Sequence, residues 1–340
     1  MKYLKMYLRK TSLPVLILSI SIVASSCDEG TTSLPKSSGK TAEMIVVTDN
    51  KGIWEGSVGN TVFSYFSTDY EVLPQPEPLF EMANVPLKNF QDAKMFRNHH
   101  NVLLLLLEPD LAEVQTEVRR NFWSQPQRVV KIEAPDEAGL IEGFQAYRET
   151  IRSLFRESDR EKLEATFHAF IDRSLVNEIG KSFGFTMDVP SGFGISKNFT
   201  GFMWLRKETN QNSQGLMIYT YDYTDQAAFR PERIISFRNS VTKAYVPGPT
   251  EGSYMIVARE FIPPVSEEIT FHGMYAVETR GLWEVENDFM GGPFVNITFV
   301  DERTNMVVAL DGYVYAPNRP KRDLLIQMEA IIHSMKFSGE

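Results

Sequence analysis

The apolar residues of this 340-residue chain change their spacing at Gly184, and this change limits the folds open to it. From residue 136 to 183 apolar side chains recur every three or four residues, as they do along helices. After Gly184, short runs such as GLMIYTYDY and MVVALDGYVY alternate apolar with polar residues. Such alternation is typical of an antiparallel sheet with one face in water. We therefore expect an α+β protein with two domains, residues 43–183 and 184–340.

The first of these halves begins with segments that predict a small α/β layer. Residues 44–48, 102–107 and 129–132 are compact apolar runs with the composition of buried strands. A helix capped by Asp49 or Asn50 is expected after the first run, and a second helix over residues 111–122. Strands that alternate with helices favour parallel pairing. Long helices over 136–183 follow, with a break or kink expected near Ser158, where the apolar stripe drifts.

The second half is expected to be an antiparallel sheet packed by helices. Pro231 opens one helix, and a last helix begins near Pro320. The strands are expected within FGFTMDV, GFMWLRK, GLMIYTYDY, SYMIVAREF, YAVETRGLW, FVNITFV and MVVALDGYVY.

Residues 1–26 have the layout of a signal peptide. Four basic residues and no acid precede an apolar run from Leu13 to Val23, and small residues follow it. The run is short for a membrane-spanning helix, which needs about 20 apolar residues. The next residue, Cys27, is the only cysteine of the chain, and the segment ASSC resembles a lipobox. We expect cleavage before Cys27 and a lipid on its thiol, which would anchor the protein in a bacterial membrane.

Residues 27–42 are rich in Ser, Thr and Gly, which is typical of a flexible tether, so order is expected to start near Glu43. Asp28 and Glu29 follow the cysteine directly. Acids at this place resemble a surface-export signal of some bacteria, and an Asp here resembles an inner-membrane retention signal of others. We favour the outer membrane or the cell surface within the cell envelope.

Charge and cysteine content exclude several classes of partner and of chemistry. The formal charge of −9 becomes −13 when the four positive charges of residues 1–26 are removed. Nucleic acid and anionic lipid surfaces both require a basic face, so neither is expected as a partner. With one cysteine the chain forms no internal disulfide, thiolate metal site or cysteine nucleophile beyond Cys27.

The sequence lacks the short motifs that bind cofactors or present a nucleophile. Gly52, Gly56 and Gly59 follow a strand, but their spacing differs from that of a dinucleotide loop, and we interpret them as a tight strand-to-helix turn. His99 and His100 are adjacent, so their rings should diverge, and we expect histidines at the surface or at helix ends. No G-x-S-x-G turn is present. No cofactor or metal is therefore expected.

Two segments of the second half offer a candidate binding surface. The stretch 283–288 holds Trp283, Glu284 and Glu286, which could serve a glycosidase or form the solvated face of a strand. The aromatic loops 244–254 and 287–294 carry Tyr245, Tyr254 and Phe289 beside Gly and Pro. Such loops give rigid contact area or fold back on the sheet as long hairpin turns.

The chain resembles a family of Bacteroidetes lipoproteins, that of domain of unknown function 4837. The resemblance lies in the lipobox-like start and in the strings IWEG, LPQPEPLF, FRNSVTKAYVPGP, GLWEV and DGYVYAP, and in the apolar strand after Arg97. It extends over nearly the whole chain after the leader. It implies an envelope compartment and supplies no active site.

Two hypotheses on function remain. The favoured one is a non-catalytic envelope module that binds a partner protein or a glycan through its loops and the groove between the halves. The alternative is a hydrolase of envelope glycans or peptides, with carboxylates assembled from distant segments. Acids that converge in a cleft would favour the hydrolase.

Overall fold

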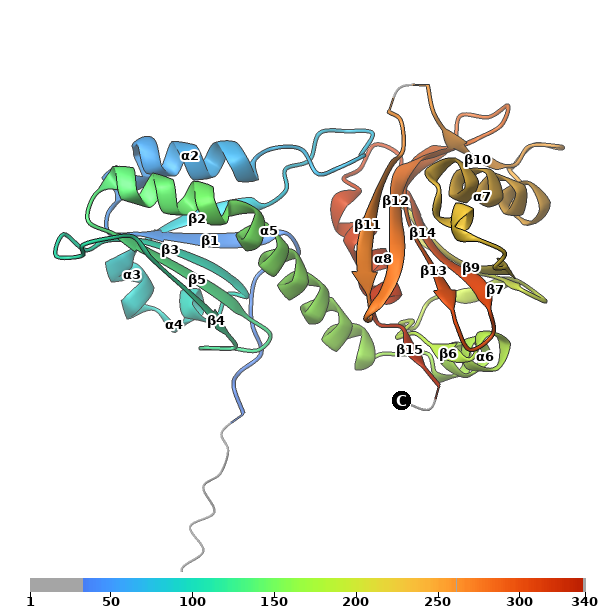
Figure 1. Ribbon diagram of the computed structural model, residues 1–340, viewed down its shortest axis with the longest axis horizontal. Helices are drawn as coiled ribbons and strands as arrows, with labels where there is room; N and C mark the ends of the chain where they lie inside the picture. The colour runs from blue at the N-terminus through green and yellow to red at the C-terminus, as the bar shows by residue number, and fades with distance from the viewer. Residues whose placement is uncertain (1–32, 261, 339–340) are drawn as a thin grey trace, which may run out of the picture. The chain divides into compact units, whose positions relative to one another are not determined.

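The structure, a computed structural model, describes residues 33–260 and 262–338 (Figure 1). The predicted signal peptide and Cys27 lie outside these residues. Within them, no helix is long and apolar enough to cross a membrane.

A five-stranded sheet forms the first half, in the order β2-β1-β3-β5-β4. Its strands are β1 Glu43–Thr48, β2 Glu81–Pro86, β3 Asn101–Leu107, β4 Gln115–Arg120 and β5 Arg128–Ala134. Neighbours pair in parallel except for β4, which is antiparallel to β5. The α/β layer with parallel strands is confirmed.

Helices cover both faces of this sheet (Figure 1), which explains the continuous apolar run of β3. One face packs against α2 Ser57–Phe66 and α5 Glu137–His168. The other packs against α3 Leu87–Asp92 and α4 Lys94–Arg97 through Phe90 and Phe96. A short helix, α1 Lys51–Glu55, follows β1, and the side chain of Asn50 caps it, as expected.

The helix expected over 111–122 is wrong, because this segment contains the edge strand β4. Leu111, Val114 and Val118 have helical spacing, but β5 offers an open edge with unpaired backbone groups. Pairing with β5 leaves Val118 46% exposed, so the apolar stripe of the expected helix is not buried as one face.

Of the break or kink expected near Ser158, the break is also wrong. The helix α5 runs unbroken from Glu137 to His168, although its ribbon bends along the way (Figure 1). Ser158 and Asp159 are buried polar residues that contact His100, and this is why the apolar stripe is interrupted there. The chain leaves the helix only after His168 and starts α6 Arg173–Phe183 at the cap Asp172.

Part of the predicted tether packs against this half. Ala42 is buried, the Ser38 amide donates to the carbonyl of Asn98, and the His100 amide donates to that of Ser38. Order therefore begins before Glu43, because backbone groups of the segment find partners at the start of β3.

The second half is built on an eight-stranded antiparallel sheet in the order β10-β12-β13-β14-β9-β8-β7, with β11 also on β12. The strands are β7 Gly194–Phe199, β8 Phe202–Glu208, β9 Ser213–Asp222, β10 Met255–Ala258, β11 Val265–Phe271, β12 Met274–Val285, β13 Gly291–Asp301 and β14 Met306–Tyr315. The expected α+β class with an antiparallel second sheet is confirmed.

The expectation of one wet face is wrong for the centre of this sheet. The helix α8 Arg322–His333 covers one face and α7 Pro231–Tyr245 part of the other (Figure 1). The middle strands β13 and β14 are buried along both faces. Asn296 of β13 and Asp311 of β14 face α7, where Arg238 is buried as well.

Three short elements complete the chain. A 3-10 helix, η1 Gln226–Phe229, precedes α7. The segment FGFTMDV gives only β6 Phe185–Thr186, which pairs with β15 Lys336–Phe337 outside the large sheet.

The two large sheets share no strand pairing among the described residues. Side chains do connect the halves: Tyr70 donates to Glu329 at 2.5 Å, and Arg280 donates to the same carboxylate at 2.7 Å. The division into two domains stays a prediction.

Candidate functional site

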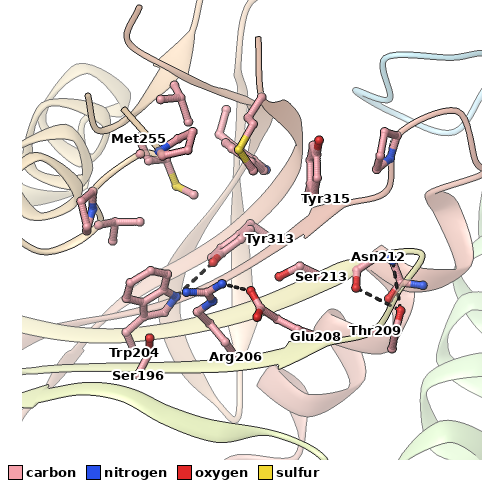
Figure 2. A pocket seen from close by; sticks show the side chains of 18 of the residues that line it. Ser196, Trp204, Arg206, Glu208, Thr209, Asn212, Ser213, Met255, Tyr313 and Tyr315 are labelled. Atoms are coloured by element: carbon pink, nitrogen blue, oxygen red, sulfur yellow. Dashed lines mark hydrogen bonds and ion pairs between the residues drawn. The ribbon is translucent and has the colours of Figure 1, made fainter. Parts of the chain in front are cut away.

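The α7 helix leaves part of its face of the large sheet uncovered, and a cavity of about 650 Å³ lies there (Figure 2). The cavity adjoins Val246, the residue that ends α7. All of its lining residues lie between Ser196 and Pro317, within the second half. Pockets of this size hold small ligands in many proteins.

Three buried aromatic side chains form the floor: Trp204 of β8, Trp283 of β12 and Tyr313 of β14. Alternation along each strand turns them to the α7 face. The indole Nε1 of Trp204 donates to the Tyr313 hydroxyl at 3.1 Å, and that of Trp283 donates to the carbonyl of Val314 at 3.2 Å (Figure 2 shows the first). Both rings are therefore fixed without a ligand.

Glycine makes room for one of these rings. A Cβ at Gly215 of β9 would overlap the ring of Tyr313, its partner in the sheet register. Burial raises the pKa of Tyr313 to about 12, so its hydroxyl stays protonated and neutral at physiological pH.

The walls differ in character. One wall is apolar and comes from the chain after α7, from β10, from the end of β12 and from the turn before β13. It consists of Val246, Pro247, Pro249, Met255, Val285 and Met290. The opposite wall is polar and consists of Lys197, Arg206, Glu208 and the β8–β9 turn from Thr209 to Ser213. The cavity thus suits a ligand with one apolar and one polar end.

The polar wall is held by contacts within itself. Arg206 forms an ion pair with Glu208 and places its guanidinium 4.9 Å from the ring centroid of Trp204 (Figure 2). In the turn, the Thr209 hydroxyl accepts from the amides of Gln211 and Asn212 at 3.2 and 3.0 Å. These contacts hold the polar wall in place without a ligand.

Of the six residues proposed from the sequence, Trp283 lines the cavity, and the others lie outside its lining. Tyr245 stacks on Phe202 with ring centroids 4.4 Å apart. Tyr254 lies under the ammonium of Lys243, and Phe289 is fully exposed on a loop. Glu284 and Glu286 are exposed and half-buried, respectively. Binding by any of the six stays a prediction.

The sequence reasoning missed Lys197, Trp204, Arg206, Glu208, Tyr313 and Tyr315. A signal for part of this set exists, because Trp204, Arg206 and Glu208 alternate along one strand and so share a face. Which side of the sheet that face meets depends on the packing of α7, which the pattern does not contain.

The glycine-rich segment has a structural role, but at a junction of two helices rather than at the strand-to-helix turn that we expected. Gly56 separates α1 from α2, and a Cβ at Gly59 would overlap the backbone of Trp54. The glycines thus permit a close approach of two short helices.

The expectation that His99 and His100 lie at the surface with diverging rings is wrong. His99 and His100 are buried at the start of β3 with stacked rings, 4.7 Å between centroids. The carboxylate of Asp159 lies 2.8 Å from His100 Nε2, and Glu43 lies 3.3 Å from His99 Nε2. These partners orient the rings, which explains why adjacent histidines need not diverge.

Two other hollows have a different character. One of about 550 Å³ lies between α5 and the strands β11 and β12, where we expected a groove between the halves, but Arg156 and Arg280 in its wall already bind Glu71 and Glu329. The other, of about 1110 Å³, is bordered by the turn after β13 and the exposed Tyr275.

Within residues 33–260 and 262–338, no three His, Cys, Asp or Glu side chains gather as a metal site.

Comparison with known proteins assigns parts of this chain to sequence families for which no activity is described. Residues 172–334 match the sequence model of a family described as Domain of unknown function (DUF4837). Residues 37–168 match that of another, Domain of unknown function (DUF8532). The expected match to domain of unknown function 4837 is confirmed for residues 172–334 only, because residues 37–168 match a different family. The Bacteroidetes lineage and the lipoprotein character stay predictions.

No curated protein matches this chain in sequence. Among solved structures, the Ran-binding protein Mog1p of Saccharomyces cerevisiae is similar over 46% of this chain and 90% of its own, with 10% identity and a TM-score of 0.30. LpqN of Mycobacterium tuberculosis, described as involved in cell envelope biogenesis, is similar over 45% of this chain and 82% of its own, with 12% identity and a TM-score of 0.27. Likenesses this distant carry no argument about function.

Proposed function

We propose that this protein is a lipid-anchored, non-catalytic binding module of a bacterial cell envelope, and that its ligand enters the cavity on the α7 face of the large sheet. The observation that carries the proposal is the floor of three buried aromatic rings, Trp204, Trp283 and Tyr313. Two of them are locked by hydrogen bonds, so a ligand would meet a surface that needs no reordering.

The composition of the lining favours binding over hydrolysis. A glycosidase needs two carboxylates across one cleft. Among the described residues of this lining, Glu208 is the one carboxylate, and it forms an ion pair with Arg206. Glu284 and Glu286, the acids that the sequence suggested for catalysis, are not part of the lining. The acids of the described residues therefore do not converge at this cavity.

The cellular location of the protein is proposed from the sequence. The leader, the unique Cys27 and the acids after it support a mature protein that starts at Cys27 and is held by lipid in the outer membrane or at the cell surface. A partner would then be an envelope protein or glycan, and nucleic acid is disfavoured by the negative charge.

Capture from envelopes tests the proposal. The lipidated full-length protein serves as bait in detergent-solubilised envelopes, beside a Tyr315→Ala variant at the cavity and a Tyr147→Ala variant on α5. Tyr315 is half-buried in the lining, and Tyr147 is 42% exposed elsewhere. We expect a protein or glycan that wild type and Tyr147→Ala retain and Tyr315→Ala loses.

Two results would overturn the proposal. One is capture that Tyr315→Ala leaves unchanged, since the cavity would then not be the binding site. The other is turnover of model glycosides, esters or peptides that Glu208→Gln abolishes, which would establish the hydrolase.

A further inference from the structure

We infer that the part of the ligand that enters this cavity is a small amphipathic anionic group, with an apolar ring or chain against the Trp283 and Met255 side and one negative charge facing Lys197. The inference rests on the proposed function and adds the chemical class of the ligand. It is argued from the charge of the lining and from the strand that carries Lys197.

The lining is positively charged although the chain carries a formal charge of −9. Its charged side chains are Lys197, Arg206 and Glu208. Arg206 is paired with Glu208 and lies over Trp204, so these two charges offset each other. Lys197 has no ion-pair partner within the part of the chain that the structure describes. One positive charge in the cavity is therefore left for a ligand.

A β-bulge brings Lys197 to the cavity. In the pairing of β7 with β8, Ile195 lies opposite Leu205 and Lys197 opposite Trp204, so Ser196 is an extra residue. In a regular ladder Ser196 would lie opposite Trp204, and Lys197 would point to the other face, because side chains alternate along a strand. Bulges re-aim side chains in this way. Opposite residues share a face, so Lys197 lies on the same side as the Trp204 ring.

Lys197 is half-buried and lines the same cavity as the aromatic floor, where a charge interacts more strongly than in open water. An anion that displaces water from this place gains a charge-assisted hydrogen bond. A neutral polar group gains less from the same ammonium. The cavity therefore distinguishes ligands by charge as well as by shape.

The apolar wall defines the rest of the ligand. Met255 and Val285 are buried, and Met290 is half-buried at the rim. Methionine side chains adapt to rings and chains of different shape. The cavity volume of about 650 Å³ limits the ligand to the size of a small molecule or of one end of a larger one.

A matched pair of fluorescent probes tests the inference on the full chain. Anilinonaphthalene sulfonate carries an aromatic body with one negative charge, and N-phenylnaphthylamine has the same body without the charge. Binding is read from energy transfer from tryptophan, since Trp204 and Trp283 line the cavity.

Lys197→Met removes the charge at the cavity, and Lys207→Met is the matched control. Lys207 lies on the same strand as Trp204 but opposite Gln214, which bonds to α8 on the other face.

We expect saturable binding of one sulfonate probe per chain. Its affinity should fall about tenfold in Lys197→Met, equivalent to about 1.4 kcal/mol. It should stay unchanged in Lys207→Met, and the neutral probe should bind more weakly and equally to all three proteins. Displacement by decanoate, by decyl phosphate and by decanol then distinguishes a carboxylate from a phosphate head group, with decanol as the weakest competitor.

Equal binding of both probes, or sulfonate binding that Lys197→Met leaves unchanged, would overturn the anionic class while envelope capture through Tyr315 could still succeed. Absence of saturable binding of either probe would overturn the amphipathic class as a whole. Failure of the proposed function would appear separately, as capture that does not depend on Tyr315.

Discussion

Arg238 of α7 and Asp311 of β14 form a two-point ion pair between the helix and the large sheet, with Nε to Oδ2 at 2.8 Å and Nη2 to Oδ1 at 3.1 Å. Both side chains are fully buried. Asn296 donates to the same carboxylate at 2.9 Å and to the hydroxyl of Tyr219 at 3.0 Å. The guanidinium also lies 3.9 Å from the ring centroid of Phe294. The pair thus ties α7 to the sheet whose remaining face forms the cavity.

Asp311→Ala should lower the free energy of unfolding by about 3–5 kcal/mol, because it leaves the Arg238 guanidinium buried without its partner. Urea denaturation followed by circular dichroism measures the change. The double variant Arg238→Met with Asp311→Leu should lose less, since it removes both buried charges. Glu55→Ala, which breaks the exposed pair of Lys51 and Glu55, should cost less than about 1 kcal/mol. A single variant as stable as wild type would show that this ion pair does not stabilise the fold.

Gly215→Ala should displace the ring of Tyr313 from the cavity floor, because the added Cβ overlaps it. We expect loss of ligand capture and a decrease in stability of about 1–3 kcal/mol from overpacking. Gly194→Ala is the matched control on β7, since a Cβ there meets nothing within 4 Å. Envelope capture and urea denaturation of both variants test this. Capture by Gly215→Ala at the wild-type level would contradict a role for the Tyr313 floor.

His99 should make stability depend on pH. Burial and the neighbouring His100 lower the pKa of His99 to about 4, against the opposing effect of Glu43. The folded protein therefore keeps His99 neutral while the unfolded chain protonates near pH 6.5. This contribution is fully present above pH 6.5 and is lost as the pH falls toward about 4.

A comparison of variants isolates this effect, because other groups titrate in the same range. The stability difference between wild type and His99→Gln should decrease by on the order of 2–3 kcal/mol between pH 7 and pH 4. His168→Gln, which changes an exposed histidine paired with Asp188, should leave the pH dependence of wild type intact. The measurement is urea denaturation at each pH. A constant difference between wild type and His99→Gln would refute the assignment.

Cys27 should carry lipid in the mature protein. Intact mass of protein extracted from membranes should correspond to cleavage before Cys27 plus acyl chains. Cys27→Ala should stay uncleaved or leave the membrane fraction, and Ser26→Ala, which keeps a small residue beside the cysteine, should behave as wild type. A free thiol at Cys27, or cleavage elsewhere, would contradict the anchor.

The sequence by itself determined most elements of this protein and the type of its two sheets. The run Val102 to Leu107 is buried on both faces, as a continuous apolar strand should be, and Pro231 begins α7. Gly184 ends α6 in the left-handed conformation that glycine adopts most easily. These features depend on residues within a few positions of one another, so local patterns suffice to predict them.

Tertiary structure alone decided the pairing of β4, the burial of the two adjacent histidines and the candidate cavity. The segment Gln115–Arg120 is a strand because β5 has a free edge, and no pattern within the segment records that edge. The floor residues Trp204, Trp283 and Tyr313 lie on three strands that are far apart in the sequence. Alternation shows that each of them faces inward, but which strands become neighbours, and how much of their face α7 leaves open, depends on the packing energy of the whole sheet.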